Sequence, residues 1–202
     1  MPRVASFRSV LDFEKAIAEF AGAKYGIAVE TCTAALLLSC CYKKVEEVEI
    51  PKKTYVSVPC SIMHAGGKVR FRNENWKGIY ELKPYNIIDS ALRFKKGMYV
   101  KGSLYCLSFH FRKLLPIGRG GMILTDDKKA RNWLLKARFD GRTEGVPLDK
   151  DKFNMVGWNF YMLPETAARG LQTFHFLKNK KLDDIDTKTQ GYQDLSKFSI
   201  FK

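Results

Sequence analysis

A lysine at the end of an apolar strand is the residue of this chain best placed to do chemistry. The run from Ser108 to Lys113 reads Ser-Phe-His-Phe-Arg-Lys, and a glycine-rich turn follows at 118–121. A lysine at such a junction is partly removed from water, which lowers the pKa of its amine and makes it a usable nucleophile. The alternative is a solvated loop lysine, because most lysines lie on the surface.

Two further segments could bind an anion or a ring. Thr31, Cys32 and Thr33 stand between an expected strand and an expected helix. The free N–H groups of a helix start, with a hydroxyl beside them, can hold a phosphate dianion. The alternative is a threonine that only caps the helix. Asp89 ends an apolar strand, where α/β sheets place ligand contacts, although it could equally cap the next turn.

Two other residues are weaker candidates by themselves. Tyr55 begins an expected helix shortly after Pro51, and its ring could either face a ligand or cover the core. Asn159 lies in the run 157–162, which alone indicates a loop before a helix.

Apolar spacing indicates that strands and helices alternate and position these residues. A helix capped by Ser9 and ended by Gly22 comes first. The sequence predicts further helices at 33–41, 55–64, 128–138 and 164–176, and strands at 25–29, 48–50, 68–71, 85–88, 104–109 and 121–125. Residues 73–84 are expected to be irregular. The alternation predicts an α/β fold, a three-layer α/β/α arrangement with a mainly parallel sheet.

Length and composition limit the organisation and the partners. The 202 residues suffice for one well-buried core and are too few for two large domains. We expect one domain over 1–177 and a lysine-rich tail, or the remnant of a small domain, over 178–202. The formal net charge of +14 favours polyanions or anionic ligands, including nucleic acid, or belongs simply to a solvated lysine-rich surface.

Cysteine usage and hydropathy indicate the compartment. The five cysteines form no Cys-x-x-Cys pair and lie in apolar segments, so we expect buried, reduced thiols and a cytoplasmic protein. The three histidines lack metal-ligand spacing, and no metal site is expected. Residues 1–4 lack the apolar run of a signal peptide, and no stretch reaches the length of about 18 apolar residues that a membrane span needs.

These segments, taken in order, resemble the DegT/DnrJ/EryC1/StrS family of sugar aminotransferases. Its members are pyridoxal 5'-phosphate (PLP) enzymes of aspartate-aminotransferase fold type. The family's active-site segment runs Ser-Phe-His, two variable residues, Lys, and then Gly-Glu-Gly-Gly five residues on. Here every position matches except the glutamate, which is Arg119. The resemblance extends from about Phe13 to Leu177.

The resemblance implies where the reactive aldehyde and the phosphate of PLP are held. Lys113 would carry PLP as a Schiff base, and Ser108 would contact the phosphate. The family's Asn-Gly-Thr phosphate cradle corresponds to Thr31-Cys32-Thr33, so Cys32 would offer its N–H and Thr33 its hydroxyl. Losing the glycine puts the tight turn of the cradle in question.

The resemblance also assigns the ring contacts and a dimer. Asp89 would face the pyridine nitrogen, and Tyr55 would stack on the ring. Asn159 would reach the phosphate of a neighbouring subunit, which implies a homodimer with shared active sites. Two family residues are absent, because Leu92 stands for a glutamine and Tyr161 for an arginine.

By resemblance, the chain is a PLP-dependent aminotransferase that moves an amino group, with glutamate as donor, to a keto sugar carried on a nucleotide. It lacks a strand-helix unit and a histidine segment that the family carries between positions 71 and 89. A PLP enzyme that acts on a polyanion such as modified nucleic acid is one alternative. A PLP-fold remnant that serves as a non-catalytic binding protein is another.

Overall fold

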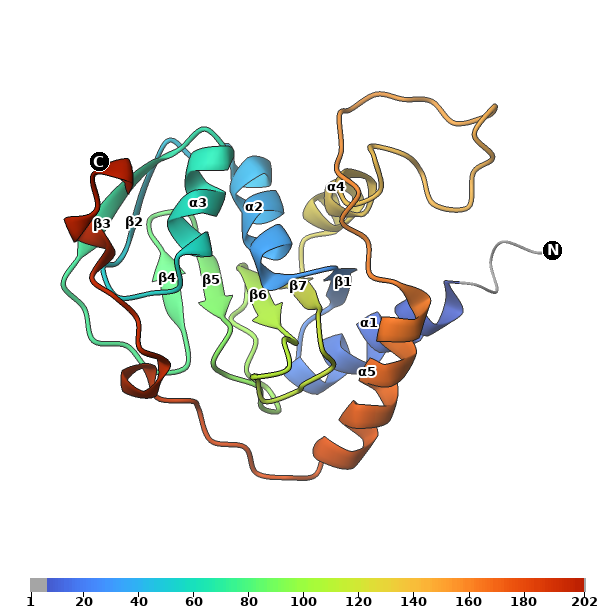
Figure 1. Cartoon of the computed structure of the whole chain (residues 1–202). Helices are drawn as coiled ribbons and strands as arrows, with labels where there is room; N and C mark the ends of the chain where they lie inside the picture. The colour runs from blue at the N-terminus through green and yellow to red at the C-terminus, as the bar shows by residue number, and fades with distance from the viewer. Residues whose placement is uncertain (1–6, 202) are drawn as a thin grey trace.

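The computed structural model describes residues 7–201 as a central sheet with helices on both sides (Figure 1). Residues 1–6, which include the segment inspected for a signal peptide, lie outside the described part, as does Lys202. Among the described residues, no helix is both long enough and apolar enough to cross a membrane.

The helices and strands follow the expected order, and each expected element is present to within two residues at either end. The helices are α1 (Arg8–Ala21), α2 (Cys32–Lys43), α3 (Ser57–His64), α4 (Lys128–Ala137) and α5 (Pro164–Leu177). The strands are β1 (Tyr25–Val29), β2 (Glu47–Pro51), β3 (Lys68–Arg72), β4 (Tyr80–Leu82), β5 (Ile87–Ser90), β6 (Leu104–Ser108) and β7 (Gly121–Thr125). Three short 3-10 turns end the chain at Thr187–Gln190, Leu195–Lys197 and Ser199–Phe201.

Two apolar layers cover the two faces of the main sheet. Side chains alternate between the faces of a strand, so neighbouring residues of β5 belong to different layers. Ile87 packs with α2, α3 and α4, whereas Ile88 packs with α1 and α5. The three-layer α/β/α architecture is thereby confirmed. The same alternation turns Asp89 toward the face that α2 and α3 cover.

The strand directions differ from the expected mainly parallel sheet. The five-stranded sheet has the order β1-β7-β6-β5-β4, and three of its four strand pairs are antiparallel. The pairs β5–β6 and β2–β3 are parallel. The reason lies in the connections: β6 joins β7 and β4 joins β5 through loops without a crossover helix, and such loops return the chain antiparallel.

Strand β4 lies in the stretch that was expected to be irregular, and that expectation is wrong. Its three residues pair with β5, and Tyr80 lies directly opposite Asp89. Just beyond it, Glu49 of β2 and Lys83 exchange two backbone hydrogen bonds of 2.9 and 3.1 Å. This bridge connects the two-stranded β2–β3 sheet to the main sheet.

Helix α1 begins earlier than its sequence suggests. Its first residue is Arg8, and the expected cap, Ser9, instead donates its hydroxyl hydrogen to the carbonyl of Pro164 at 2.9 Å. A contact distant in sequence has replaced a local one and ties α1 to α5. Gly22 ends the helix in the left-handed conformation, as expected, with a φ of 83°.

A buried ion pair ties α1, β1 and the end of α4 together. The Glu14 carboxylate accepts from the N–H of Ala28 at 2.8 Å and from the guanidinium of Arg138. Arg138 is 1% exposed and also pairs with Glu144 at 2.8 Å. Burial of two charges is tolerated only with this many partners. The network therefore attaches β1, the strand that pairs with β7, to α1 and α4.

Residues 178–201, the C-terminal segment, fold back across the domain and end beside β3 (Figure 1). Asp184 accepts a bidentate pair from Arg93, the shorter contact being 2.7 Å. Further on, the N–H of Leu195 donates to the carbonyl of Lys52 at 2.8 Å. The segment is therefore attached to the rest of the domain near its beginning, at Asp184, and near its end, at Leu195.

All five cysteines are free thiols, as expected. Cys40 and Cys106 are fully buried, but Cys32, Cys41 and Cys60 are only partly buried because they lie near helix ends or on outer helix faces. Within residues 7–201, no group of three or more His, Cys, Asp or Glu side chains has the arrangement of a metal site.

Candidate active site

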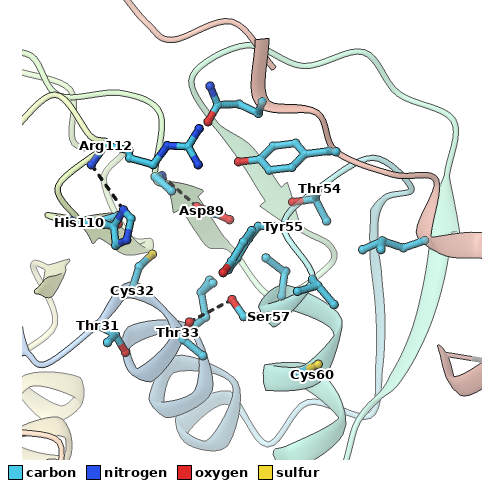
Figure 2. Close-up of a pocket in the computed structure, with 18 of the residues that line it drawn as sticks. Thr31, Cys32, Thr33, Thr54, Tyr55, Ser57, Cys60, Asp89, His110 and Arg112 are labelled. Carbon is cyan, nitrogen blue, oxygen red and sulfur yellow. Dashed lines mark hydrogen bonds between the residues drawn. The ribbon is translucent and has the colours of Figure 1, made fainter. Parts of the chain in front are cut away.

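A cavity of about 930 Å³ opens where β5 and β6 end (Figure 2). The starts of α2 and α3, the loop after β6 and the C-terminal segment line it. Its volume falls within the range of about 300–1,000 Å³ that is usual for small-molecule sites. Six of the seven residues singled out from the sequence line this one cavity: Cys32, Thr33, Tyr55, Asp89, Ser108 and Lys113.

The start of α2 forms one end of the cavity. Thr31 is the N-cap residue, and its hydroxyl accepts from the N–H of Ala34 at 3.0 Å. Its backbone is extended, and Cys32 is the first helical residue. Thr31, Cys32 and Thr33, all within the described part of the chain, have no positive φ. The cysteine therefore fits where the family has glycine, and the first residues of α2, whose N–H groups have no partner within the helix, line the cavity.

Gly121 allows this turn to lie close to β7. A Cβ at Gly121 would be 2.4 Å from the carbonyl carbon and oxygen of Thr31 and 2.6 Å from the nitrogen of Cys32. All of these are backbone atoms, which cannot rotate away. The second glycine of the Gly-Gly pair is thus required by the cradle rather than by the loop itself.

The start of α3 meets the start of α2 at the cavity wall. The hydroxyls of Thr33 and Ser57 lie 2.9 Å apart and are hydrogen-bonded (Figure 2). Both helix starts carry partial positive charge from their peptide dipoles. Two hydroxyls between two such ends form an environment that favours an anion.

Asp89 is buried deep in the cavity wall, with 4% of its surface exposed. Its Oδ1 accepts from the N–H of Ala91 at 2.9 Å, and its Oδ2 accepts from the hydroxyl of Tyr80 at 2.8 Å. Burial raises the pKa of Asp89, while both hydrogen bonds and the charge of Lys113 act to lower it. A carboxylate held in this way is ready to face a cationic ring nitrogen.

Lys113 lies in the loop between β6 and β7 and is half-buried. The loop is held by backbone hydrogen bonds, among them Phe109 N–H to Gly120 carbonyl at 2.9 Å. Burial lowers the pKa of Lys113, and the carboxylate of Asp89 opposes that shift. The amine is therefore uncharged at a lower pH than that of a surface lysine, as a nucleophile requires.

Cys32 lies near both of these charged groups. Burial raises the pKa of its thiol well above the ordinary value, and the nearby Asp89 carboxylate adds to the effect, while Lys113 opposes it. The thiol is consequently protonated at neutral pH and has no nucleophilic thiolate. Ser108 ends β6 next to this group, and its hydroxyl accepts weakly from the N–H of His110 at 3.5 Å.

Aromatic rings form the opposite wall. Tyr55 is 58% exposed and its ring stands in the middle of the cavity (Figure 2). The ring of Tyr192, from the C-terminal segment, is tilted against it at 6.4 Å between centroids. Tyr192 also stacks on Trp76 at 6.2 Å. Residues of the C-terminal segment thus complete a wall begun by α3.

Asn159 is the one predicted site residue that the fold does not bring to this cavity. It is exposed, and its side-chain amide donates to Asp140 at 3.0 Å, just beyond the end of α4. Its position gives it no contact with the cavity of its own chain.

Sequence reasoning missed several residues of the cavity wall. Thr54, Ser57, Trp76, Arg112 and Tyr192 line the cavity, and Tyr80 supports it from behind through Asp89. An aromatic residue opposite a strand-end carboxylate would have been the signal for Tyr80. That signal depends on recognising β4, which is only three residues long.

Comparison with known proteins gives the context for this geometry. The model of the DegT/DnrJ/EryC1/StrS aminotransferase family matches residues 3–77 and 96–198. The spore coat polysaccharide biosynthesis protein SpsC of Bacillus subtilis is 28% identical over 90% of this chain. The GDP-perosamine synthase of Caulobacter vibrioides is 27% identical over 81% of it. The chain spans only 59% and 56% of the lengths of these two relatives.

Solved structures share the fold. The 3-amino-5-hydroxybenzoic acid synthase superposes with a TM-score of 0.72 at 17% identity, over 84% of this chain and 56% of its own. Helicobacter pylori PseC, an aminotransferase involved in pseudoaminic acid biosynthesis, has a TM-score of 0.69 at 14% identity, over 96% of this chain and 79% of its own. From the match of its family model over most of the sequence, the chain belongs to the DegT/DnrJ/EryC1/StrS aminotransferase family.

Proposed function

We propose that this protein is a PLP-dependent aminotransferase that acts on a sugar. One observation carries the proposal: a half-buried lysine of lowered pKa and a buried aspartate line the same cavity as a helix start that suits an anion. Those three features match the three ends of PLP, namely the aldehyde, the pyridine nitrogen and the phosphate.

The donor set of the cavity fits the cofactor in its chemistry. The start of α2, with the hydroxyls of Thr33 and Ser57, suits a phosphate. Ser108 adds a further hydroxyl on the facing strand end. Asp89 supplies a carboxylate for a protonated pyridine nitrogen, and Tyr55 supplies an exposed aromatic face against which a ring can stack.

Within this proposal Lys113 has two tasks. Its amine, whose pKa burial lowers, would bind the aldehyde carbon of PLP covalently with loss of water. After an amino donor had displaced it, the same amine would act as the base that takes the proton from the donor's α-carbon and as the acid that gives it back. When bound, PLP supplies the electron sink that makes this α-carbon acidic. Asp89 keeps the sink effective by holding positive charge on the ring nitrogen.

We propose glutamate as the amino donor and a nucleotide-linked keto sugar as the acceptor. The names of the two curated relatives, a polysaccharide biosynthesis protein and a GDP-perosamine synthase, support an acceptor of this class. The net charge of +14 also favours an acceptor that carries phosphates. We further propose the cytoplasm as the site of action, because all five cysteines are thiols.

We also propose that the enzyme is a homodimer and that the C-terminal segment closes one side of the active site. Asn159 is exposed and does not line the cavity of its own chain, as is expected of a residue that serves a neighbouring subunit. The C-terminal segment supports the second point because Tyr192 and Leu195 line the cavity.

The test is the visible absorbance of the protein with added PLP, followed by borohydride reduction and peptide mass mapping. We expect a yellow protein with a pyridoxyl group on Lys113. The Lys113→Ala variant should stay colourless. Lys101→Ala, an exposed lysine away from the cavity, serves as the matched control and should be yellow.

A colourless wild-type protein at saturating PLP would contradict the proposal and favour a non-catalytic binding role. If the protein binds PLP but turns over no nucleotide sugar, the charge of +14 makes a nucleic acid the next substrate class to test. Its binding should weaken steeply with added salt, since each phosphate contact releases counterions.

A further inference from the structure

The support for Asp89 comes from a part of the chain that the family model does not match. The two matched ranges end at residue 77 and resume at 96, so β4 and β5 lie between them. Tyr80 is on β4 and Asp89 on β5, directly opposite each other in the strand register. The contact between them therefore lies outside the part of the chain that the family model describes.

Three side chains form a buried line that ends on the carboxylate. The hydroxyls of Thr54 and Tyr80 are 2.6 Å apart, and the hydroxyl of Tyr80 is 2.8 Å from Oδ2 of Asp89. Their exposed fractions are 2%, 4% and 4%. The ring of Tyr80 is packed edge-on against Trp76, with centroids 4.5 Å apart. All three side chains are therefore almost completely buried, although Thr54 and Asp89 also line the cavity.

The chemistry of the groups sets the direction of each hydrogen bond. An ionised carboxylate can only accept, so Tyr80 donates its single hydroxyl hydrogen to Asp89. Tyr80 then has only lone pairs left for its other neighbour, and Thr54 must donate to it. Burial alone would favour the neutral form of Asp89, whereas a donated hydrogen bond favours the charged form.

We propose that Tyr80, oriented by Thr54, is a positioning residue that keeps Asp89 ionised and aimed at the ring nitrogen of the cofactor. This inference rests on the proposed function, because it concerns the same site. Tyr80 acts on the cofactor only through Asp89. Its loss should therefore matter only for a ring that carries a nitrogen.

The test compares two cofactors in the Tyr80→Phe variant. One is PLP, and the other is the PLP analogue in which carbon replaces the ring nitrogen. Equilibrium dissociation constants are read from the absorbance change on binding. We expect Tyr80→Phe to weaken PLP binding by about 10- to 100-fold, the range of a hydrogen bond to a charged group. Binding of the analogue should stay within about 2-fold of wild type.

Tyr105→Phe is the matched control. Tyr105 is also fully buried and hydrogen-bonded, to Ser90 at 3.1 Å, but it packs in the layer of α1 and α5. We expect it to lower stability without changing either dissociation constant. An equal loss for both cofactors in Tyr80→Phe would overturn the inference, because it would show a purely structural role.

Failure of wild-type protein to bind PLP would overturn the proposed function together with this inference. If Tyr80→Phe does not fold, Thr54→Val decides the matter, since it leaves the tyrosine packing in place and removes only the donor behind it. We expect Thr54→Val to weaken PLP binding by roughly 2- to 10-fold and to spare the analogue. No selective loss in Thr54→Val would overturn the inference.

Discussion

Gly121→Ala tests whether the contact between β7 and the start of α2 builds the anion site. The added methyl group would lie 2.4 Å from two backbone atoms of Thr31 and 2.6 Å from the nitrogen of Cys32. Ordinary van der Waals contact begins near 3.4 Å. The first turn of α2 must therefore move away from β7 by about 1 Å, since no side chain can rotate to make room.

The size of the effect follows from that displacement. Overpacking of this kind costs about 1–3 kcal/mol of stability. A shift of about 1 Å in a group that holds a reactant can reduce activity by about 100-fold. We expect Gly121→Ala to weaken PLP binding by about 10- to 100-fold and to lower the free energy of unfolding by about 2 kcal/mol.

The assay is PLP titration by absorbance, with urea unfolding followed by tryptophan fluorescence. Gly120→Ala is the control because it makes the same change one residue earlier. Its Cβ would lie 3.0 Å from the ends of the Ile117 and Met162 side chains, which are flexible. A smaller loss of affinity is expected there. Binding of PLP by Gly121→Ala within 2-fold of wild type would refute the reasoning.

Three further predictions concern the lysine, the buried ion pair and the dimer. Burial lowers the pKa of Lys113, so the rate of covalent PLP attachment, measured by borohydride trapping, should be half-maximal at a pH below the ordinary lysine pKa of 10.5. The rate should fall as the pH is lowered through that midpoint. Asp89→Asn should move the midpoint still lower, since the carboxylate opposes the effect of burial; an upward shift would contradict the argument. Arg138→Met leaves the Glu14 carboxylate buried without its partner and should lower the free energy of unfolding in urea by about 3–5 kcal/mol. A similar loss of stability in a variant of an exposed lysine of α4 would show that the ion pair is not responsible. If a dimer shares its active sites, Asn159→Ala alone should bind PLP poorly, and mixing it with Lys113→Ala subunits should restore about a quarter of the wild-type sites; an unmixed Asn159→Ala protein that binds PLP like wild type would contradict shared sites.

Much of the fold could be predicted because its apolar patterns are strong and local. Helices such as α1 and α5 repeat apolar residues at helical spacing, and strands such as β6 and β7 are short apolar runs between turn residues. The direction of the strands could not be predicted in this way. It depends on whether the connecting segment crosses a face of the sheet, and the loop between β6 and β7 does not.

The chemistry-bearing residues were recognisable one by one, and the distance between them in space was not. Asp89 lies near the end of an apolar strand, Lys113 in the loop after one, and Thr33 at a helix start after another, and the sequence alone indicated each of these places. Tertiary structure decided that they share one cavity while Asn159 lies outside it. It also decided the role of Tyr80, because a three-residue strand has too little pattern of its own and forms only when a neighbouring strand supplies its hydrogen bonds.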